Sequence, residues 1–366
     1  MSQRRATCKR IFLCLLFFLV LGTLYRYESF IFIRIFTQIG FCLVSLYFSW
    51  QLSRIVSYAR AKVSPDNKAV LITGCDTGFG HSLAQQLASL GYQVFAGVLH
   101  IDGDGAKRLR KFSRNLKVVE LDVCSDKSVA KAEKFLIDNI DKDRKLWAIV
   151  NNAGIAHSAA IEWGSDDISE IFKDQFEVNT FGTLRVTRTF LPYLRKTVQS
   201  RVIIVSSEAS RLVLPGLTGY SMTKHAVRAF GEGLRREVRH LGINVCLIEP
   251  GFYATSITDI DRCEKDLLTN WLKTPLKKRE ELGEDSYQNS VKRLKTFLST
   301  RRSNTQEVID SMLDSVTSTE PRYYYNVDGI GNLAFLNLIS YLPDELQDFI
   351  GLEMIDRFVK LIQNQS

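Results

Sequence analysis

Short apolar runs alternate with longer amphipathic segments from about residue 68 onward. Short apolar runs between polar or glycine-containing stretches are typical of buried strands, and apolar residues three and four apart are typical of helices packed on a core. The predicted strands are 69–73, 93–98, 116–121, 146–150, 202–205 and 243–248. The predicted helices are 79–90, 128–139, 172–196 and 219–240. This alternation predicts an α/β fold with a doubly wound parallel sheet and helices on both faces.

Two longer apolar runs precede this pattern. Residues 11–25 follow four basic residues, and residues 30–52 are interrupted only by Arg34, Thr37 and Gln38. The first run is short for a membrane-spanning helix, which needs about 20 residues, and the second is long enough. Because no small-residue cleavage pattern follows the first run, a retained anchor is favoured over a cleaved signal. We predict that residues 1–62 form a membrane anchor of one or two helices, either as a hairpin or as one span with an interfacial helix.

The charge and the cysteines exclude several classes of protein. The net charge is +8 and the pI is near 9.0, but the basic residues are spread out and no nucleic-acid-binding motif accompanies them. A basic surface facing anionic membrane lipid is therefore favoured, and no nucleic-acid partner is expected. The seven cysteines form no CxxC pair, which indicates a reducing compartment, and no histidine has metal-ligand spacing.

A glycine-rich loop follows the first predicted strand. Residues 73–80 read TGCDTGFG, with Gly74, Gly78 and Gly80 at positions that allow a tight turn and a close approach of the backbone to a pyrophosphate. The phosphates would lie at the N-terminus of the helix that begins near Phe79, where free N–H groups attract anions. This loop predicts a dinucleotide site and an α/β fold of the Rossmann type, preceded by N-terminal membrane helices.

Tyr220 and Lys224 are four residues apart on a predicted helix, so their side chains lie on one face. Oxidation of an alcohol by hydride transfer needs a base for the hydroxyl proton. A tyrosine pKa of about 10 is too high for this task near neutral pH. We expect the neighbouring cation of Lys224 to lower the pKa of Tyr220.

Several further motifs follow one another in the order and at the spacing of a known protein family. Together with the glycine loop and the tyrosine–lysine pair, the chain resembles the short-chain dehydrogenase/reductase superfamily over roughly residues 67–330. The loop variant and the strand with Trp147 are similar to the branch of retinol, hydroxysteroid and 3-hydroxybutyrate dehydrogenases, and the similarity continues through 308–325, a helix and a last strand in that branch. The motifs that carry the resemblance are LDV at 121–123, NNAG at 151–154, Asn179 in VNTFG, Ser206-Ser207, YSMTK at 220–224 and Pro250-Gly251.

The resemblance implies a role for each site residue. Tyr220 would be the acid/base, Lys224 would bind the nicotinamide ribose, Ser207 would polarise the substrate oxygen, and Asn179 would position Lys224 through a water molecule. The implied cofactor-binding residues are Gly74, Asp76, Thr77, Gly78, Phe79, Gly80, Asp122, Asn151, Ala153, Gly154, Tyr220, Lys224, Pro250, Gly251 and Thr255. The implied domains are an NAD-binding dehydrogenase domain at 67–330, with a substrate lid at 252–301, and a helical extension at 331–366 that either lies on the bilayer or packs on the core.

The cofactor prediction depends on Asp76. The usual sign of NAD binding is a carboxylate at the end of the second strand, but residues 98–100 are Val-Leu-His. No arginine stands there to receive the 2′-phosphate of NADP either. Asp76 lies in the glycine loop, where its charge would repel a 2′-phosphate. We therefore predict NAD.

Apolar residues follow Gly251 and precede Tyr220, which predicts an apolar substrate pocket with Ser207, Phe252 and Tyr253 in contact with the substrate. An apolar pocket beside a membrane anchor suits a retinoid or a hydroxysteroid. The alternative is a 3-hydroxybutyrate-type enzyme, which would need a fixed cation, and Arg211 is the nearest in the sequence. A third possibility is a binding protein that has the fold without the activity, but the presence of all four candidate catalytic residues argues against it. The expected location is the endoplasmic reticulum membrane, with a mitochondrial membrane as the alternative, and the resemblance implies a homodimer.

Overall fold

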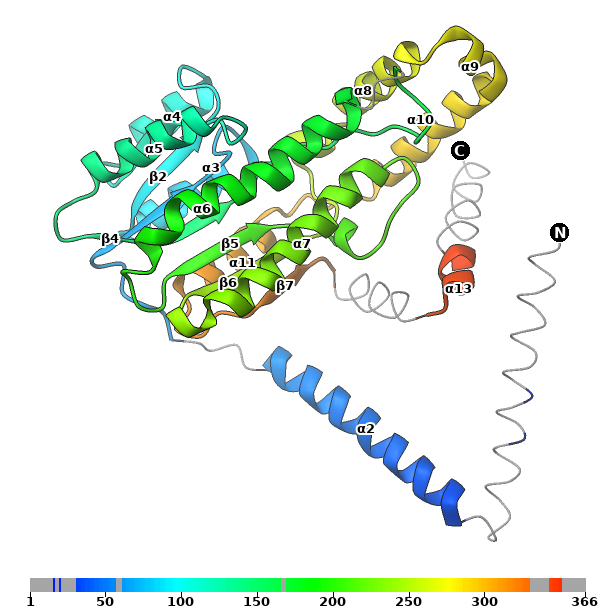
Figure 1. The fold of residues 1–366 in the computed structure, drawn as a ribbon, viewed down its shortest axis with the longest axis horizontal. Helices are drawn as coiled ribbons and strands as arrows, with labels where there is room; N and C mark the ends of the chain where they lie inside the picture. The colour runs from blue at the N-terminus through cyan, green and yellow to red at the C-terminus, as the bar shows by residue number, and fades with distance from the viewer. Residues whose placement is uncertain are drawn as a thin grey trace. The chain divides into compact units, whose positions relative to one another are not determined.

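The computed structural model describes residues 16 and 20 and residues 31–56, 61–165, 169–329 and 342–350. The chain divides into two compact units, Met1–Ala61 and Lys62–Ser366. The larger unit contains the whole sheet and the helices that pack on it (Figure 1).

A seven-stranded parallel sheet forms the centre of the larger unit, with strand order β3-β2-β1-β4-β5-β6-β7. The order reverses between β1 and β4, so the loops after these two strands diverge and leave a crevice at their carboxyl ends. The strands are β1 (Lys68–Ile72), β2 (Gln93–Val98), β3 (Leu116–Glu120), β4 (Lys145–Asn151), β5 (Arg201–Val205), β6 (Asn244–Pro250) and β7 (Tyr324–Val327).

Three helices cover each face of the sheet, as the alternation predicted. The helices of one face are α3 (Gly78–Ser89), α4 (Asp104–Phe112) and α11 (Gln306–Thr317). The helices of the other face are α5 (Asp126–Asn139), α6 (Thr183–Leu194) and α7 (Thr218–Val238). Alternate residues of β1 point to opposite faces, so Val70 packs with Leu83 and Met312, while Leu71 packs with Phe190. The predicted doubly wound fold is confirmed.

The predicted helix 172–196 is divided in the structure. Two π-helical turns, Ser169–Lys173 and Phe176–Gly182, precede α6. A π-turn adds one residue to the helical turn, and such turns are frequent at functional sites. Asn179 lies in the second π-turn and is buried. The sequence pattern did not predict these turns, because apolar spacing reports the buried face of a helix and not its exact pitch.

The predicted lid is helical. It consists of α8 (Ile260–Lys273), α9 (Leu276–Leu282) and α10 (Glu284–Ser299), which lie together away from the sheet (Figure 1). Pro275 separates α8 from α9, and Gly283, with φ of 77°, separates α9 from α10. Trp271 lies between Trp163 and Tyr287, with ring centroids 4.9 and 5.9 Å away. This aromatic cluster attaches the lid to the loop that follows β4.

The smaller unit contains α2 (Ile31–Val56), which begins within the second predicted membrane run and extends four residues beyond its end at residue 52. Among the residues that the structure describes, no helix is both long and apolar enough to cross a membrane. The first predicted run, apart from residues 16 and 20, lies outside the described residues. So does most of the predicted extension at 331–366, of which the structure describes α13 (Asp344–Asp348) and its neighbours.

Candidate active site

The glycine loop makes a tight turn between β1 and α3. Gly74 and Gly78 have φ values of 68° and 65°, in the left-handed region that favours glycine. A Cβ atom on Gly74 would lie 2.8 Å from Cα of Ala153, so the loop touches the backbone that follows β4. The Asn152 amide donates to the carbonyl oxygens of Thr73 and Gly74, at 2.9 and 3.0 Å. These bonds hold the loop open toward the crevice.

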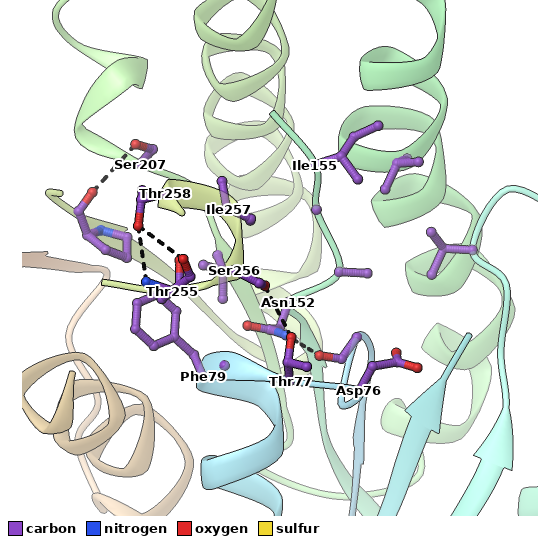
Figure 2. Close-up of a pocket in the computed structure, with 18 of the residues that line it drawn as sticks. Asp76, Thr77, Phe79, Asn152, Ile155, Ser207, Thr255, Ser256, Ile257 and Thr258 are labelled. Carbon is purple, nitrogen blue, oxygen red and sulfur yellow. Dashed lines mark hydrogen bonds between the residues drawn. The ribbon is translucent and has the colours of Figure 1, made fainter. Parts of the chain in front are cut away.

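The N-terminus of α3 faces a cavity of about 290 Å³. Thr77 caps this helix without a side-chain hydrogen bond, which leaves the first N–H groups available to an anion. Thr77 Oγ1 instead lies 3.2 Å from Ser256 Oγ, on the segment after β6, and Figure 2 shows the two side chains facing each other. The cavity thus has the anion-binding end and the elongated lining that a dinucleotide requires, and we call it the cofactor cavity.

Most of the predicted cofactor-binding residues line the cofactor cavity. They are Gly74, Asp76, Thr77, Gly78, Phe79, Asp122, Ala153, Gly154, Tyr220, Lys224, Pro250, Gly251 and Thr255. Gly80 is buried beneath the loop, where a Cβ atom would lie 2.4 Å from the Asn152 amide nitrogen. Its role is therefore to let α3 pack closely on β4.

Asn151 is not among the residues that line the cofactor cavity, so its cofactor role stays a prediction. Its side chain donates to Thr187 Oγ1 at 3.0 Å, within the core. The next residue, Asn152, lines the cavity instead. Successive side chains alternate across a strand, and the motif NNAG alone does not reveal which of its two asparagines faces the crevice.

Asp76 belongs to the glycine loop, and its carboxylate binds the backbone just after the end of β2. Its two carboxylate oxygens accept hydrogen bonds from the backbone N–H groups of Leu99 and His100, at 3.0 and 3.1 Å. Asp76 and Leu99 both line the cofactor cavity. A carboxylate therefore stands where the second strand ends, although the strand itself carries none. The sequence rule missed this arrangement because the acidic residue comes from another part of the chain.

Three of the four predicted catalytic residues, Ser207, Tyr220 and Lys224, line the cofactor cavity, and the fourth, Asn179, is buried next to Gly154. The hydroxyls of Ser207 and Tyr220 are hydrogen-bonded, and Lys224 Nζ lies 5.6 Å from the centre of the Tyr220 ring. Asn179 binds both backbone groups of Ile155, accepting from N–H at 2.8 Å and donating to the carbonyl at 2.9 Å. The four residues come from three separate parts of the chain: the second π-turn, the turn that follows β5, and α7.

Gly154 fills the space between two of these residues. A Cβ atom there would lie 3.2 Å from Asn179 Oδ1 and 3.7 Å from Lys224 Nζ. A side chain at this position would therefore crowd the Asn179 amide and touch the Lys224 ammonium. Glycine leaves the space beside these two groups unfilled.

The pKa of Tyr220 is raised in the structure, whereas the sequence analysis expected it to be lowered. Burial raises the pKa of Tyr220 to about 12, and only the hydroxyl of Ser207 acts against this rise. Burial lowers the pKa of Lys224 to about 8. The ammonium donates to the Val205 carbonyl at 3.0 Å, so it does not lower the pKa of the phenol as we expected. In this state the phenol is a proton donor, which is the acid form needed for carbonyl reduction.

A second cavity of about 200 Å³ adjoins the first at Ser207 and Tyr220. We call it the substrate cavity. Phe252 lines it, as predicted, together with mostly apolar residues of the lid and of the loop before α7, among them Leu214, Leu217, Ile257, Leu267 and Phe297. Tyr253 does not line it: the ring is buried 6.2 Å from that of Phe79, and the residue lines the cofactor cavity. The substrate role of Tyr253 therefore stays a prediction that the lining of the substrate cavity does not support.

Glu208 directly follows Ser207, and its carboxyl group lies against that of Asp328. A Cβ atom on Gly251 would lie 2.7 Å from Asp328 Oδ2 and 2.9 Å from Glu208 Oε2, so the two carboxyl groups meet beneath the cavity floor. Burial and the charge of Asp328 raise the pKa of Glu208 to about 8, against a smaller opposing effect of Arg211. Glu208 is therefore protonated at neutral pH and is hydrogen-bonded to the carboxyl group of Asp328.

Replacing Glu208 with glutamine is expected to reduce the loss of stability at alkaline pH. Because folding raises the pKa of Glu208, its contribution to stability is complete below its unfolded pKa and is lost as the pH rises through about 8. The melting temperature of the wild type should therefore fall more between pH 6 and pH 9 than that of Glu208→Gln. The exposed Glu162→Gln variant is the control. Equal slopes for wild type and Glu208→Gln would contradict the raised pKa of Glu208.

Comparison with known proteins identifies the family. A family model described as short chain dehydrogenase matches residues 68–265. The chain is 38% identical over 286 residues to bovine 17-beta-hydroxysteroid dehydrogenase type 6, with 78% of this chain and 87% of that protein covered. It is 33% identical to mouse mitochondrial D-beta-hydroxybutyrate dehydrogenase, with 80% and 86% covered. It is 34% identical to mouse retinol dehydrogenase 7, with 84% and 94% covered.

Solved structures share the fold. A short chain dehydrogenase from Burkholderia phymatum in complex with NAD has a TM-score of 0.63 at 23% identity, with 78% of this chain and 96% of that chain covered. One from Burkholderia cenocepacia in complex with NADP has a TM-score of 0.57 at 20% identity, with 79% and 99% covered. The fold, the glycine loop at the strand reversal and the family match agree, and the chain belongs to the short-chain dehydrogenase family.

Proposed function

We propose that this dehydrogenase interconverts a lipophilic alcohol and its carbonyl compound, with NAD as the cofactor. The observation that carries the proposal is an apolar substrate cavity that opens onto Ser207 and Tyr220. Tyr220 would give or take the proton of the substrate oxygen, and Ser207 would hold that oxygen by a hydrogen bond. When bound, the dinucleotide supplies the hydride acceptor or donor.

Two named relatives support a steroid or a retinoid as the substrate class, namely the 17-beta-hydroxysteroid and retinol dehydrogenases. The lining of the substrate cavity agrees with such a substrate, because a large apolar body loses contact with water against leucine and phenylalanine side chains. Ser207 and Tyr220 are the polar groups at the reacting end.

The alternative is a short hydroxy acid, which the relationship to D-beta-hydroxybutyrate dehydrogenase favours. Its carboxylate, two bonds from the reacting carbon, would need a cation close to Tyr220. Arg211 does not fill this role: it lies 2.8 Å from the buried Glu249 and donates to Asn326 at 3.0 Å, and it is not among the residues that line the substrate cavity. The surroundings of Tyr220 therefore favour the lipophilic alcohol.

The choice of NAD over NADP rests on Asp76. Its carboxylate already accepts the N–H groups at the end of β2, and the 2′-phosphate of NADP would approach this negative charge. NAD carries a hydroxyl at that position, which can donate to a carboxylate. Replacing Asp76 with alanine should therefore lower the ratio of kcat/KM with NAD to kcat/KM with NADP about tenfold. The ratio of kcat/KM for the two cofactors measures this, and an unchanged ratio would exclude Asp76 as the determinant.

We also propose that the chain associates with membrane lipid through α2. This helix exposes large apolar side chains, with Phe36, Phe41, Leu46 and Phe48 between 66% and 74% exposed. The proposed membrane is that of the endoplasmic reticulum, with a mitochondrial membrane as the alternative. Co-sedimentation with lipid vesicles tests this, and the double variant Phe41→Asp, Leu46→Asp should remain in the supernatant. The homodimer stays a prediction.

One assay separates the two substrate classes. The detergent-purified chain is offered NAD or NADP with retinol, a 17β-hydroxysteroid or 3-hydroxybutyrate, and formation of the reduced cofactor is followed by absorbance. Turnover of retinol or the steroid, faster with NAD, is the expected result. Turnover of 3-hydroxybutyrate alone would mean that the protein is an enzyme for short hydroxy acids and would overturn the proposed lipophilic substrate. Turnover of none, with cofactor still bound, would overturn the proposed activity.

A further inference from the structure

The lid contributes a cation to the cofactor cavity. Of the described residues that line this cavity, Lys224 and Arg262 are the two with cationic side chains. Lys224 lies beside Tyr220 and donates to the Val205 carbonyl. Arg262 belongs to the first turn of α8, the first helix of the lid. It therefore brings a positive charge to the cavity from a segment that none of the sequence motifs includes.

Two short contacts connect Arg262 to the N-terminus of α3. Arg262 Nη1 donates to the Ser256 carbonyl at 3.1 Å, and Ser256 Oγ lies 3.2 Å from Thr77 Oγ1. Thr77 is the residue that caps α3, and Figure 2 shows it facing Ser256. All three residues line the cofactor cavity. A single residue, Ser256, thus separates the guanidinium from the end of the helix where the first N–H groups are available to an anion.

The guanidinium of Arg262 keeps donors for a ligand. It carries five N–H donors, and the bond to Ser256 uses one of them. Asp259, which caps α8, accepts the backbone N–H of Arg262 at 3.0 Å. In the part of the chain that the structure describes, the Arg262 side chain forms no ion pair with a carboxylate. Its charge is therefore available to an anion in the cavity.

The order of the strands indicates which part of a dinucleotide would lie at this position. Asp76 binds the backbone at the end of β2, and Lys224 donates to Val205 at the end of β5. In the sheet β1 lies between β2 and β5, so the N-terminus of α3, which follows β1, is between these two ends of the cavity. A dinucleotide has a nucleoside at each end and its pyrophosphate in the middle. The pyrophosphate would therefore lie at the N-terminus of α3, next to Arg262.

We propose that Arg262 binds the pyrophosphate of the dinucleotide from the lid. The inference rests on the proposed dinucleotide site and holds for NAD and NADP alike, because both carry the pyrophosphate. The N-terminus of α3 supplies N–H groups and a partial positive charge, and the guanidinium adds a full charge and a planar fork of donors. Cys263 and Leu267 of the same helix line the substrate cavity, so α8 forms part of the wall of both cavities. The contact therefore joins the cofactor to the wall of the substrate cavity.

Binding of NADH to the full detergent-purified chain, followed by NADH fluorescence, tests this contact without turnover. ADP-ribose, which carries the pyrophosphate, and adenosine, which does not, are used to displace the NADH. In Arg262→Met the dissociation constants of NADH and ADP-ribose should rise about fivefold, and that of adenosine should stay at the wild-type value. Arg262→Lys keeps the charge and should retain part of the affinity. In roughly 1 M salt the difference between wild type and Arg262→Met should shrink, because charges are then screened within a few ångströms.

Lys265→Met is the matched control, since Lys265 lies on α8, is exposed and is not among the described residues that line either cavity. It should leave all three dissociation constants unchanged. Equal losses in Arg262→Met and Lys265→Met would mean that the lid attracts anions without a site and would overturn the proposal. An unchanged constant for ADP-ribose in Arg262→Met, or an equal loss for adenosine, would also overturn it, while the dinucleotide site stands. A wild type that binds neither NADH nor NADPH would overturn the dinucleotide site itself.

Discussion

Replacing Tyr220 with phenylalanine is expected to lower kcat about 1,000-fold, because it removes the group that we propose transfers the substrate proton. The phenylalanine keeps the ring that lies 5.6 Å from Lys224 Nζ and fills the same volume. Cofactor binding should therefore change little, since the glycine loop and Asp76 are not disturbed. The measurement is single-turnover reduction of NAD together with NADH fluorescence in a binding titration.

The exposed residue Tyr323 is the matched control, because its ring is 48% exposed and lies away from both cavities. Tyr323→Phe should retain the full rate. A Tyr220→Phe variant that retains a tenth or more of the activity would show that another group moves the proton. A variant that no longer binds NADH would instead indicate that the ring supports the cofactor cavity.

Replacing Arg201 with leucine is expected to lower the free energy of unfolding by about 3 kcal/mol. This arginine is fully buried at the start of β5, and its guanidinium donates to the carbonyl oxygens of Ser315, Val316 and Ser318 at the end of α11. The carbonyl groups at a helix C-terminus have no partner within the helix, and here no water reaches them. The guanidinium also lies 4.7 Å above the Trp147 ring. Leucine would fill part of the space and remove the donor of the Ser315 and Ser318 carbonyl groups, while the Val316 carbonyl would keep its bond from the Trp147 indole N–H at 3.1 Å.

Urea unfolding monitored by tryptophan fluorescence measures this effect. The exposed Arg114→Leu variant is the control and should stay within about 0.5 kcal/mol of the wild type. Because Arg201 lies at the amino end of its strand, opposite the cavities, Arg201→Leu should keep the KM values of the wild type below the unfolding transition. A loss of less than 1 kcal/mol would mean that the end of α11 finds other donors.

The sequence alone determined the alternation of strands and helices and the glycine loop. It also placed Tyr220 and Lys224 on one helix face, four residues apart. These features are local: the period of apolar residues depends on the geometry of one element, and the turn at Gly74 depends on φ values that glycine adopts without strain. Strand β2 occupies the predicted range 93–98 for this reason. The reversal between β1 and β4 then brings the loop and the catalytic helix to the same edge of the sheet.

Only the tertiary structure decided which side chains share a site. Asp76 meets the end of β2 across more than 20 positions of the chain, Arg211 is paired with Glu249, and burial raises the pKa of Tyr220 although Lys224 is one helical turn away. Hydrogen bonds, ion pairs and desolvation depend on distances between elements that are remote in the sequence, and a motif does not encode those distances. The sequence could therefore propose the catalytic residues, but their protonation and the place of Asp76 at the end of β2 follow from how the elements pack.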